Sequence, residues 1–131
     1  MPRYMLDTDT VSFALRGEGE VATRILEHKP SDLCLSSLTL AELRFRAQAR
    51  HSRKLHGLID AFSATVAVLP FDRPAADCYG SVAASLSSRG APIGGFDTLI
   101  AAHALALELI LVTGNTRHFE RVPGLTTENW R

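Results

Sequence analysis

The sequence predicts a single α/β domain with a doubly wound central parallel sheet flanked by helices. Short apolar runs of strand length alternate with longer segments whose apolar residues recur at helical spacing. Repeated strand–helix units of this kind favour a parallel sheet. The chain has 131 residues, 46% of them hydrophobic, and shows no linker, internal repeat or low-complexity segment. We therefore expect one domain over residues 1–131, long enough to bury a core without disulfides.

Apolar runs bounded by polar or turn-forming residues predict the strands. The run LILVT at residues 109–113 is the strongest of them, and the tail after Gly124 is expected to add a short edge strand. The other expected strands cover residues 4–6, 33–35 and 66–69.

Helical periodicity and capping residues predict helices at residues 7–16, 20–28, 39–50, 54–64, 72–90 and 97–107. Asp9 is the expected N-cap of the first helix, because acceptor side chains satisfy the free N–H groups there. Thr39 and Glu42 have the T-x-x-E spacing of a capping box, which predicts that a helix begins at Thr39. Pro74 suits the first turn of the helix that Asp72 caps.

Charge and cysteine content exclude several classes of protein. Lys+Arg and Asp+Glu number 14 each, so the net charge gives no general indication of nucleic-acid binding. No apolar run approaches the roughly 20 residues that a membrane span needs, and the first residues lack the order of a signal peptide, so we expect a cytoplasmic protein without membrane contact. Cys34 and Cys78 lie far apart in apolar surroundings and are expected to be buried free thiols.

Three acids stand where strand-like runs give way to helices: Asp7, Glu42 and Asp97. In a parallel sheet such junctions gather beyond the carboxyl ends of the strands, where ligands bind. Three carboxylates there would repel one another unless a cation or a shared proton relieves them. Mg²⁺, or alternatively Mn²⁺, prefers such oxygen ligands, and the ion lowers the pKa of a bound water. The sequence therefore predicts a metal site for phosphodiester hydrolysis, with Asp7 and Asp97 as direct ligands and Glu42 as a third ligand or the group that orients water. Capping roles for all three acids remain an alternative interpretation.

The segment from residue 43 to 59 has no acid but several basic side chains, among them Arg44, Arg46 and Arg50. Such a run beside the acids predicts contacts to an RNA backbone without base specificity. A solvated basic face or a protein interface is the alternative.

Four segments of the chain resemble, in order and spacing, the PIN-domain toxins called VapC: YMLDTDTVSFALRG, SSLTLAEL, GAPIGGFDTLIAAHA and LILVTGNTRHFERVPGLTTENW. The resemblance runs almost end to end, and it is strongest to a branch of ribonucleases in which initiator tRNA is a known target. It implies a PIN-like fold and a Mg²⁺-dependent endoribonuclease toxin of a type II toxin–antitoxin pair, with Asp7, Glu42 and Asp97 as family acids. It also implies a homodimer and a hetero-oligomer with a VapB-type antitoxin, whose surfaces include the apolar helices at residues 20–28 and 54–64.

The chain departs from the family pattern after the last core strand. Many PIN domains carry a fourth acid there, whereas this segment reads VTGNTRHF and offers Asn115 as the corresponding catalytic candidate. An amide oxygen can bind a metal but brings no charge, so we expect one firmly bound ion in the absence of RNA. His118 also stands where relatives often have an acid, and Arg117 joins the predicted RNA contacts.

Other functions are weighed on specific residues. A phospho-receiver domain needs a lysine after the last core strand, but the only lysines are Lys29 and Lys54. In a histidine-based ribonuclease His103 would serve, yet it lies about 120° from Asp97 around the helix and is expected in the core. A catalytically weak or inactive RNA-binding or regulatory module remains an alternative because of Asn115.

Overall fold

The first strand of the chain, β1 (Tyr4–Leu6), forms the centre of the sheet. In the computed structural model, which describes residues 1–131, the strand order is β3-β2-β1-β4-β5 and every neighbouring pair is parallel. The other strands are β2 (Leu33–Ser36), β3 (Ala67–Leu69), β4 (Ile110–Val112) and β5 (Thr127–Glu128). The predicted doubly wound parallel sheet, including the edge strand in the tail, is confirmed.

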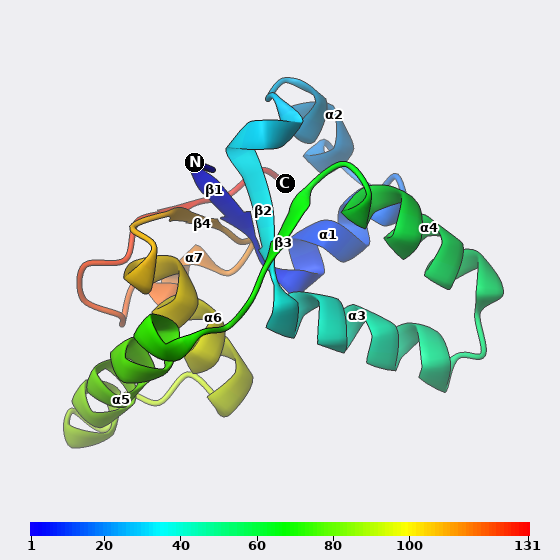
Figure 1. Cartoon of the computed structure of the whole chain (residues 1–131). Coiled ribbons are helices and arrows are strands. Elements are labelled where there is room, and N and C mark those ends of the chain that lie inside the picture. Colours follow the sequence, from blue (N-terminus) through cyan, green and yellow to red (C-terminus); the bar gives the residue numbers. More distant parts are fainter.

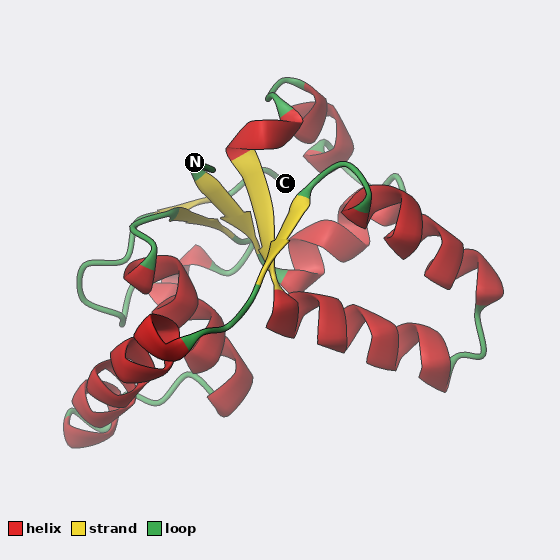
Figure 2. Ribbon diagram, viewed as in Figure 1, coloured by secondary structure: helices red, strands yellow, loops and turns green.

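Helices cover both faces of the sheet (Figures 1 and 2). One face bears α1 (Thr8–Leu15), α2 (Val21–Leu26), a 3₁₀ turn (Pro30–Asp32), α3 (Ser37–Ala49) and α4 (Arg53–Ser63). The other face bears α5 (Arg73–Ser88), α6 (Gly95–Ala106) and the short α7 (Thr116–Phe119). Of these elements only the 3₁₀ turn and α7 were not expected from the sequence.

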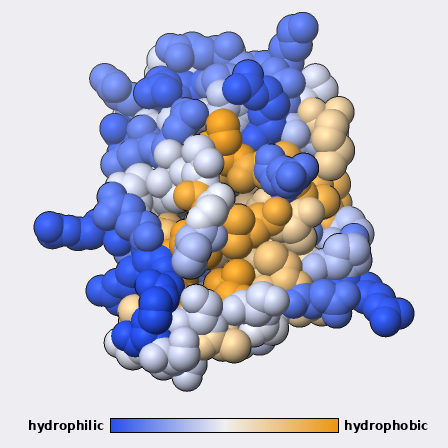
Figure 3. All heavy atoms as spheres, turned by 90° about the vertical axis from the view of Figure 1, so that its left-hand side faces the viewer, coloured by the Kyte–Doolittle hydropathy of each residue, from blue (hydrophilic) through white to orange (hydrophobic).

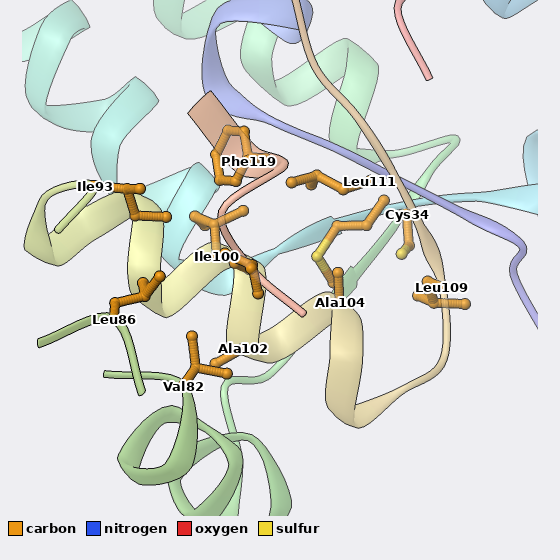
Figure 4. Packing of buried hydrophobic residues seen from close by; sticks show 13 residues of the cluster. Cys34, Val82, Leu86, Ile93, Ile100, Ala102, Ala104, Leu109, Leu111 and Phe119 are labelled. Atoms are coloured by element: carbon orange, nitrogen blue, oxygen red, sulfur yellow. The ribbon is translucent and has the colours of Figure 1, made fainter. Parts of the chain in front are cut away.

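Two hydrophobic cores follow from the alternation of side chains along each strand. Met5 and Leu111 belong to the core under α5 and α6, which Figure 4 shows closely packed. Tyr4, Leu6 and Val112 belong to the opposite core, beneath α1, α3 and α4. Both faces of the central strands are therefore buried, as a sheet covered on two sides requires.

The C-terminal tail is fixed to the second core through Trp130, whose side chain is only 1% exposed. Its ring stacks in parallel on His28 with centroids 4.5 Å apart and is tilted against Tyr4 at 5.1 Å. Its indole Nε1 donates to Glu128 at 2.9 Å. These contacts hold the edge strand β5 against β4.

Two of the predicted helix starts are wrong. Asp7, not Asp9, is the N-cap of α1. The Thr39–Glu42 capping box does not form, because α3 begins at Ser37 and is capped by Ser36, whose Oγ accepts from the backbone N–H of Leu38 at 3.1 Å. The hydroxyl of Thr39 is instead buried without a hydrogen-bond partner. Glu42 therefore has no capping role.

The two cysteines do not form a disulfide. Cys34 and Cys78 are free thiols, the first buried and the second partly buried. No helix has the length and apolar character needed to cross a membrane. Figure 3, which views the side of α5 and α6, shows apolar atoms gathered in the middle of that face with hydrophilic side chains around them.

Candidate active site

The candidate site lies beyond the carboxyl ends of β1 and β4, where the direction of sheet building reverses. From β1 the chain adds β2 and β3 on one side, and β4 and β5 form the other side. A crevice opens at such a switch point because the connections after the two central strands leave in opposite directions. Asp7 directly follows β1, and the Thr113–Asn115 segment follows β4.

Asp7 joins the central strands to the start of α1. Its backbone N–H donates to the carbonyl of Val112 at 3.0 Å, and its Oδ1 accepts from the N–H of Thr10 at 2.9 Å. Burial raises the pKa of the Asp7 carboxyl, while hydrogen bonds from Thr10 and Thr113 oppose that rise. The capping interpretation of Asp7 is thus confirmed, and it places the carboxylate at the crevice rather than excluding it.

Asp97 lies in the first turn of α6 with its side chain 45% exposed. Burial raises its pKa, and the neighbouring charges of Asp7 and Glu42 raise it further, against the opposing effect of His118. Asp97 is therefore close enough to both Asp7 and Glu42 to be repelled by them.

His118 is the partner of Asp97 that the sequence did not predict. Its Nε2 lies 3.1 Å from Asp97 Oδ2 and 2.7 Å from the carbonyl oxygen of Ile93. Both neighbours are acceptors, so this nitrogen carries a hydrogen. The only indication in the sequence was that relatives often have an acid at this position. A histidine there steadies Asp97 instead of adding a fourth negative charge.

Asn115 stands at the mouth of the crevice as the exposed residue before α7. Its backbone N–H donates to Thr113 Oγ1 at 3.0 Å, and its side chain makes no capping hydrogen bond. The amide is therefore not engaged by the helix that it precedes.

Arg46 neutralises the acids on the α3 side of the crevice. Its Nη2 lies 3.7 Å from Glu42 Oε1 and 3.1 Å from Asp9 Oδ1, and its Nη1 donates to Ser12 Oγ at 3.1 Å. Asp9 thus serves as an ion-pair partner of α3 rather than as a cap.

The remaining predicted RNA-contact residues differ in their surroundings. Arg44 turns toward α4, where it bonds Asp60 and His56, so its charge is already paired between α3 and α4. Arg50 and Arg117 are exposed and have no carboxylate within ion-pair distance.

The oxygen donors around the crevice fit a hard divalent cation in their chemistry. No three His, Cys, Asp or Glu side chains form a ready-made metal cluster, and each of the three acids also has a protein partner. Burial first, and the charges of Asp7 and Glu42 after it, raise the pKa of Asp97, and a nearby cation would oppose that rise. The arrangement therefore suits a hydrated ion that keeps several waters rather than a closed cage of protein ligands.

His103 lies in the core, as expected. It is 1% exposed, its Nδ1 lies 2.9 Å from Ser36 Oγ, and burial lowers its pKa. Phe71 packs edge-on against its ring. These contacts leave it unsuited to act on a substrate, which removes the basis for a histidine-based ribonuclease.

An apolar groove of about 380 Å³ lies on the face of α1, away from the acids. Its lining includes residues from both segments, 20–28 and 54–64, that the resemblance implied as antitoxin and dimer surfaces. The groove is lined by Ala14, Leu15, Ala22, Ile25, Leu26, His28, Pro30, Leu33, Phe62, Thr65 and Val66.

Comparisons with known proteins agree with this geometry. The model of the PIN domain family matches residues 4–125. The chain is 37% identical over 131 residues to the tRNA(fMet)-specific endonuclease VapC of Shigella flexneri, covering 99% of both chains. It is also 37% identical over 132 residues to Ribonuclease VapC2 of Haemophilus influenzae, again covering 99% of both. The crystal structure of DNA-bound VapBC from Salmonella typhimurium contains a chain that superposes with a TM-score of 0.91 at 34% identity, with full coverage of both chains.

Proposed function

We propose that this chain, which belongs to the PIN domain family and is a VapC-type ribonuclease, cuts RNA in the acidic crevice between β1 and β4 as the toxin of a toxin–antitoxin pair. The observation that supports the proposal is the position of Asp7 and Asp97 at the switch point of the sheet, where the charges of Asp7 and Glu42 both act on Asp97. The three acids come from the end of β1, from α3 and from α6, and the basic side chains around them do not fully balance their negative charge. Such a site suits a hydrolase that uses a metal ion.

Asp7 and Asp97 would hold a Mg²⁺ ion, for which Mn²⁺ can substitute, with Glu42 as the third acid and Asn115 as a neutral oxygen donor. The bound ion would neutralise charge on the scissile phosphate and lower the pKa of a water molecule. His118 keeps Asp97 oriented, and Arg46 does the same for Glu42. Glu42 then accepts a proton from the attacking water. The P–O3′ bond would break as the new P–O bond forms, and the departing O3′ would take a proton from solvent water, which leaves 5′-phosphate and 3′-hydroxyl ends.

RNA contacts in this proposal come from the arginines around the crevice. Arg50 and Arg117 offer unpaired charges, and Arg46 can share its guanidinium between Glu42 and a phosphate. Arg44 contributes less, because Asp60 already holds it. Initiator tRNA is the substrate we propose, because the chain is similar over its whole length to an endonuclease named for tRNA(fMet).

A VapB-type antitoxin is the partner we propose for the apolar groove between α1, α2 and α4. Solved structures similar to the chain include VapBC complexes, and the groove has a mainly hydrophobic lining that comes largely from α1, α2 and α4. An amphipathic helix laid into such a groove buries its apolar face, which is a recurrent mode of recognition. The homodimer implied by the resemblance and the cytoplasmic location expected from the sequence stay predictions.

The test is cleavage of initiator tRNA by the purified chain, with Mg²⁺ and with EDTA, beside Asp97→Asn. We expect cleavage only with the metal, a loss of at least about 100-fold in the variant, and 5′-phosphate ends on the product. Asp7→Asn is a second variant that keeps the cap of α1, since asparagine caps helices as well as aspartate does. Cleavage that survives both EDTA and Asp97→Asn would refute the metal mechanism.

One observation favours a second candidate, a catalytically weak RNA-binding module. Asn115 supplies no charge where many PIN domains have a fourth acid, and His118 adds a donor instead of an acceptor beside Asp97. RNA binding without cleavage at any Mg²⁺ concentration would support this alternative.

A further inference from the structure

A second charged hollow lies outside the crevice, between the end of α1, the end of α3 and the start of α4. It consists of two adjoining parts that share Arg16, Arg50 and Leu55, one of about 30 Å³ and one of about 410 Å³. We call this hollow the basic notch and define it by its polar lining: Ser12, Arg16, Glu18, Arg46, Arg50, Ser52 and Lys54.

The notch carries an excess of positive charge. Its smaller part is lined by three arginines and contains no carboxylate. Glu18 lines the larger part and pairs with Arg16 at 3.0 Å. Arg50 and Lys54 take part in no ion pair. Two cations therefore converge on the notch without any acid to balance them.

The start of α4 adds to this field. Ser52 caps the helix by accepting from the N–H of Leu55 at 3.0 Å, and both residues line the notch. The positive end of the helix dipole consequently faces the same space as the side-chain cations.

Arg46 connects the notch to the catalytic acids. It lines the smaller part of the notch, and the same guanidinium lies 3.7 Å from Glu42. A polyanion that passes from the crevice over Arg46 reaches Arg50 and Lys54 next. Guanidinium groups grouped around a small hollow suit phosphate, whose oxygens accept several N–H donors at once.

We propose that the basic notch binds a backbone phosphate of the RNA away from the scissile bond. This rests on the proposed function, because it assumes that RNA occupies the crevice. The notch thereby fixes the direction in which the RNA strand leaves Glu42, along the end of α3 and the start of α4. It carries no base specificity, since its donors reach only phosphate oxygens.

The experiment measures binding without cleavage, using protein that carries Asp97→Asn and a fluorescent single-stranded oligouridylate over a series of KCl concentrations. Arg50→Ala and Lys54→Ala are the informative variants, since neither leaves an unpaired acid behind. Arg53→Ala is the matched control, because Arg53 is an exposed cation on the same helix turn that does not line the notch. We expect the Arg50→Ala/Lys54→Ala pair to flatten the slope of log affinity against log salt by about 0.7, the value for one phosphate of a single strand. Arg53→Ala should keep the parent slope.

Equal slopes for the notch pair and the control would overturn the proposal. The proposal would also be overturned if the notch variants kept the parent slope of log RNA affinity against log salt but bound the antitoxin more weakly. That result would indicate that the notch binds an acidic peptide. The proposed function would fail by a different result: the unsubstituted chain would bind RNA but would not cleave it in the presence of Mg²⁺.

Discussion

The acidic crevice and the apolar groove lie on the same domain but are built in opposite ways. The crevice takes Asp7, Glu42 and Asp97 from β1, α3 and α6, and its acids repel one another. The groove takes its lining from residues 14–66 alone, and that lining is mainly aliphatic and aromatic. The crevice therefore concentrates negative charge, whereas the groove is a preformed apolar shape.

This difference separates the determinants of chemistry from those of partner binding. Charge at the crevice opposes folding and favours a ligand, so a ligand there adds to stability. The apolar surface of the groove is exposed to water in the free chain, and its burial by a partner would be favourable. Substitutions should consequently act on one region without the other, and the following experiments test that independence.

The largest effect is expected from Leu26→Asp in the groove. Leu26 lines the groove with 84% of its surface exposed, so the substitution leaves the free fold intact but places a charge where an antitoxin helix would pack. We expect antitoxin binding to weaken by about 2 kcal/mol or more, roughly 30-fold, with unchanged RNA cleavage. Isothermal titration calorimetry with the cognate antitoxin measures this. Phe45→Asp is the control, since Phe45 is 70% exposed and lies outside the groove. An equal loss in both variants would show that the groove is not the site.

A smaller effect is expected at the start of α3, which positions Glu42. Ser36→Ala removes the N-cap of α3 and a partner of His103, and should lower the free energy of unfolding by about 1 kcal/mol. Thr39→Val should be neutral or stabilising, because the Thr39 hydroxyl is buried without a partner. Urea unfolding compares the two variants. A loss of similar size in Thr39→Val would restore the capping box and contradict the helix start at Ser37.

The smallest effect is the pH dependence of stability in the metal-free protein. The pKa of Asp97 is raised in the folded chain, so between the ordinary and the raised pKa the folded state keeps a proton that the unfolded state has lost. Stability therefore falls as pH rises through that window. Asp97→Asn should flatten this fall by less than about 1 kcal/mol, because the half-exposed carboxylate is screened by solvent. Thermal unfolding over a pH series, without and with Mg²⁺, checks it. A steeper fall in the variant would mean that Asp97 is not repelled by its neighbours.

Much of the fold follows from local patterns in the sequence, because the short apolar runs around Met5 and Leu111 predict strands and the periodic, capped segments between the runs predict helices. The start of α3 could not be predicted in this way. Ser36, Ser37 and Thr39 are all capping types, and only the extended backbone at Ser36 and the burial of Thr39 decide between them.

The gathering of the acids was predictable, whereas their partners were not. Arg46 reaches Asp9 across 37 residues and His118 meets Asp97 from a helix of four residues. Such contacts depend on tertiary packing, which the hydrophobic periodicity of the sequence does not reveal. The roles of the acids in metal binding stay predictions.

The central position of β1 also sets the order in which the two regions come into existence during translation. All residues that line the groove have been synthesised once Val66 has been added, while the crevice needs Asp97, the β4 partner of β1 and His118, which are added later. At about 5–20 residues per second, this interval lasts a few seconds. A nascent chain thus displays the lining for its inhibitor before it possesses the means to cut RNA.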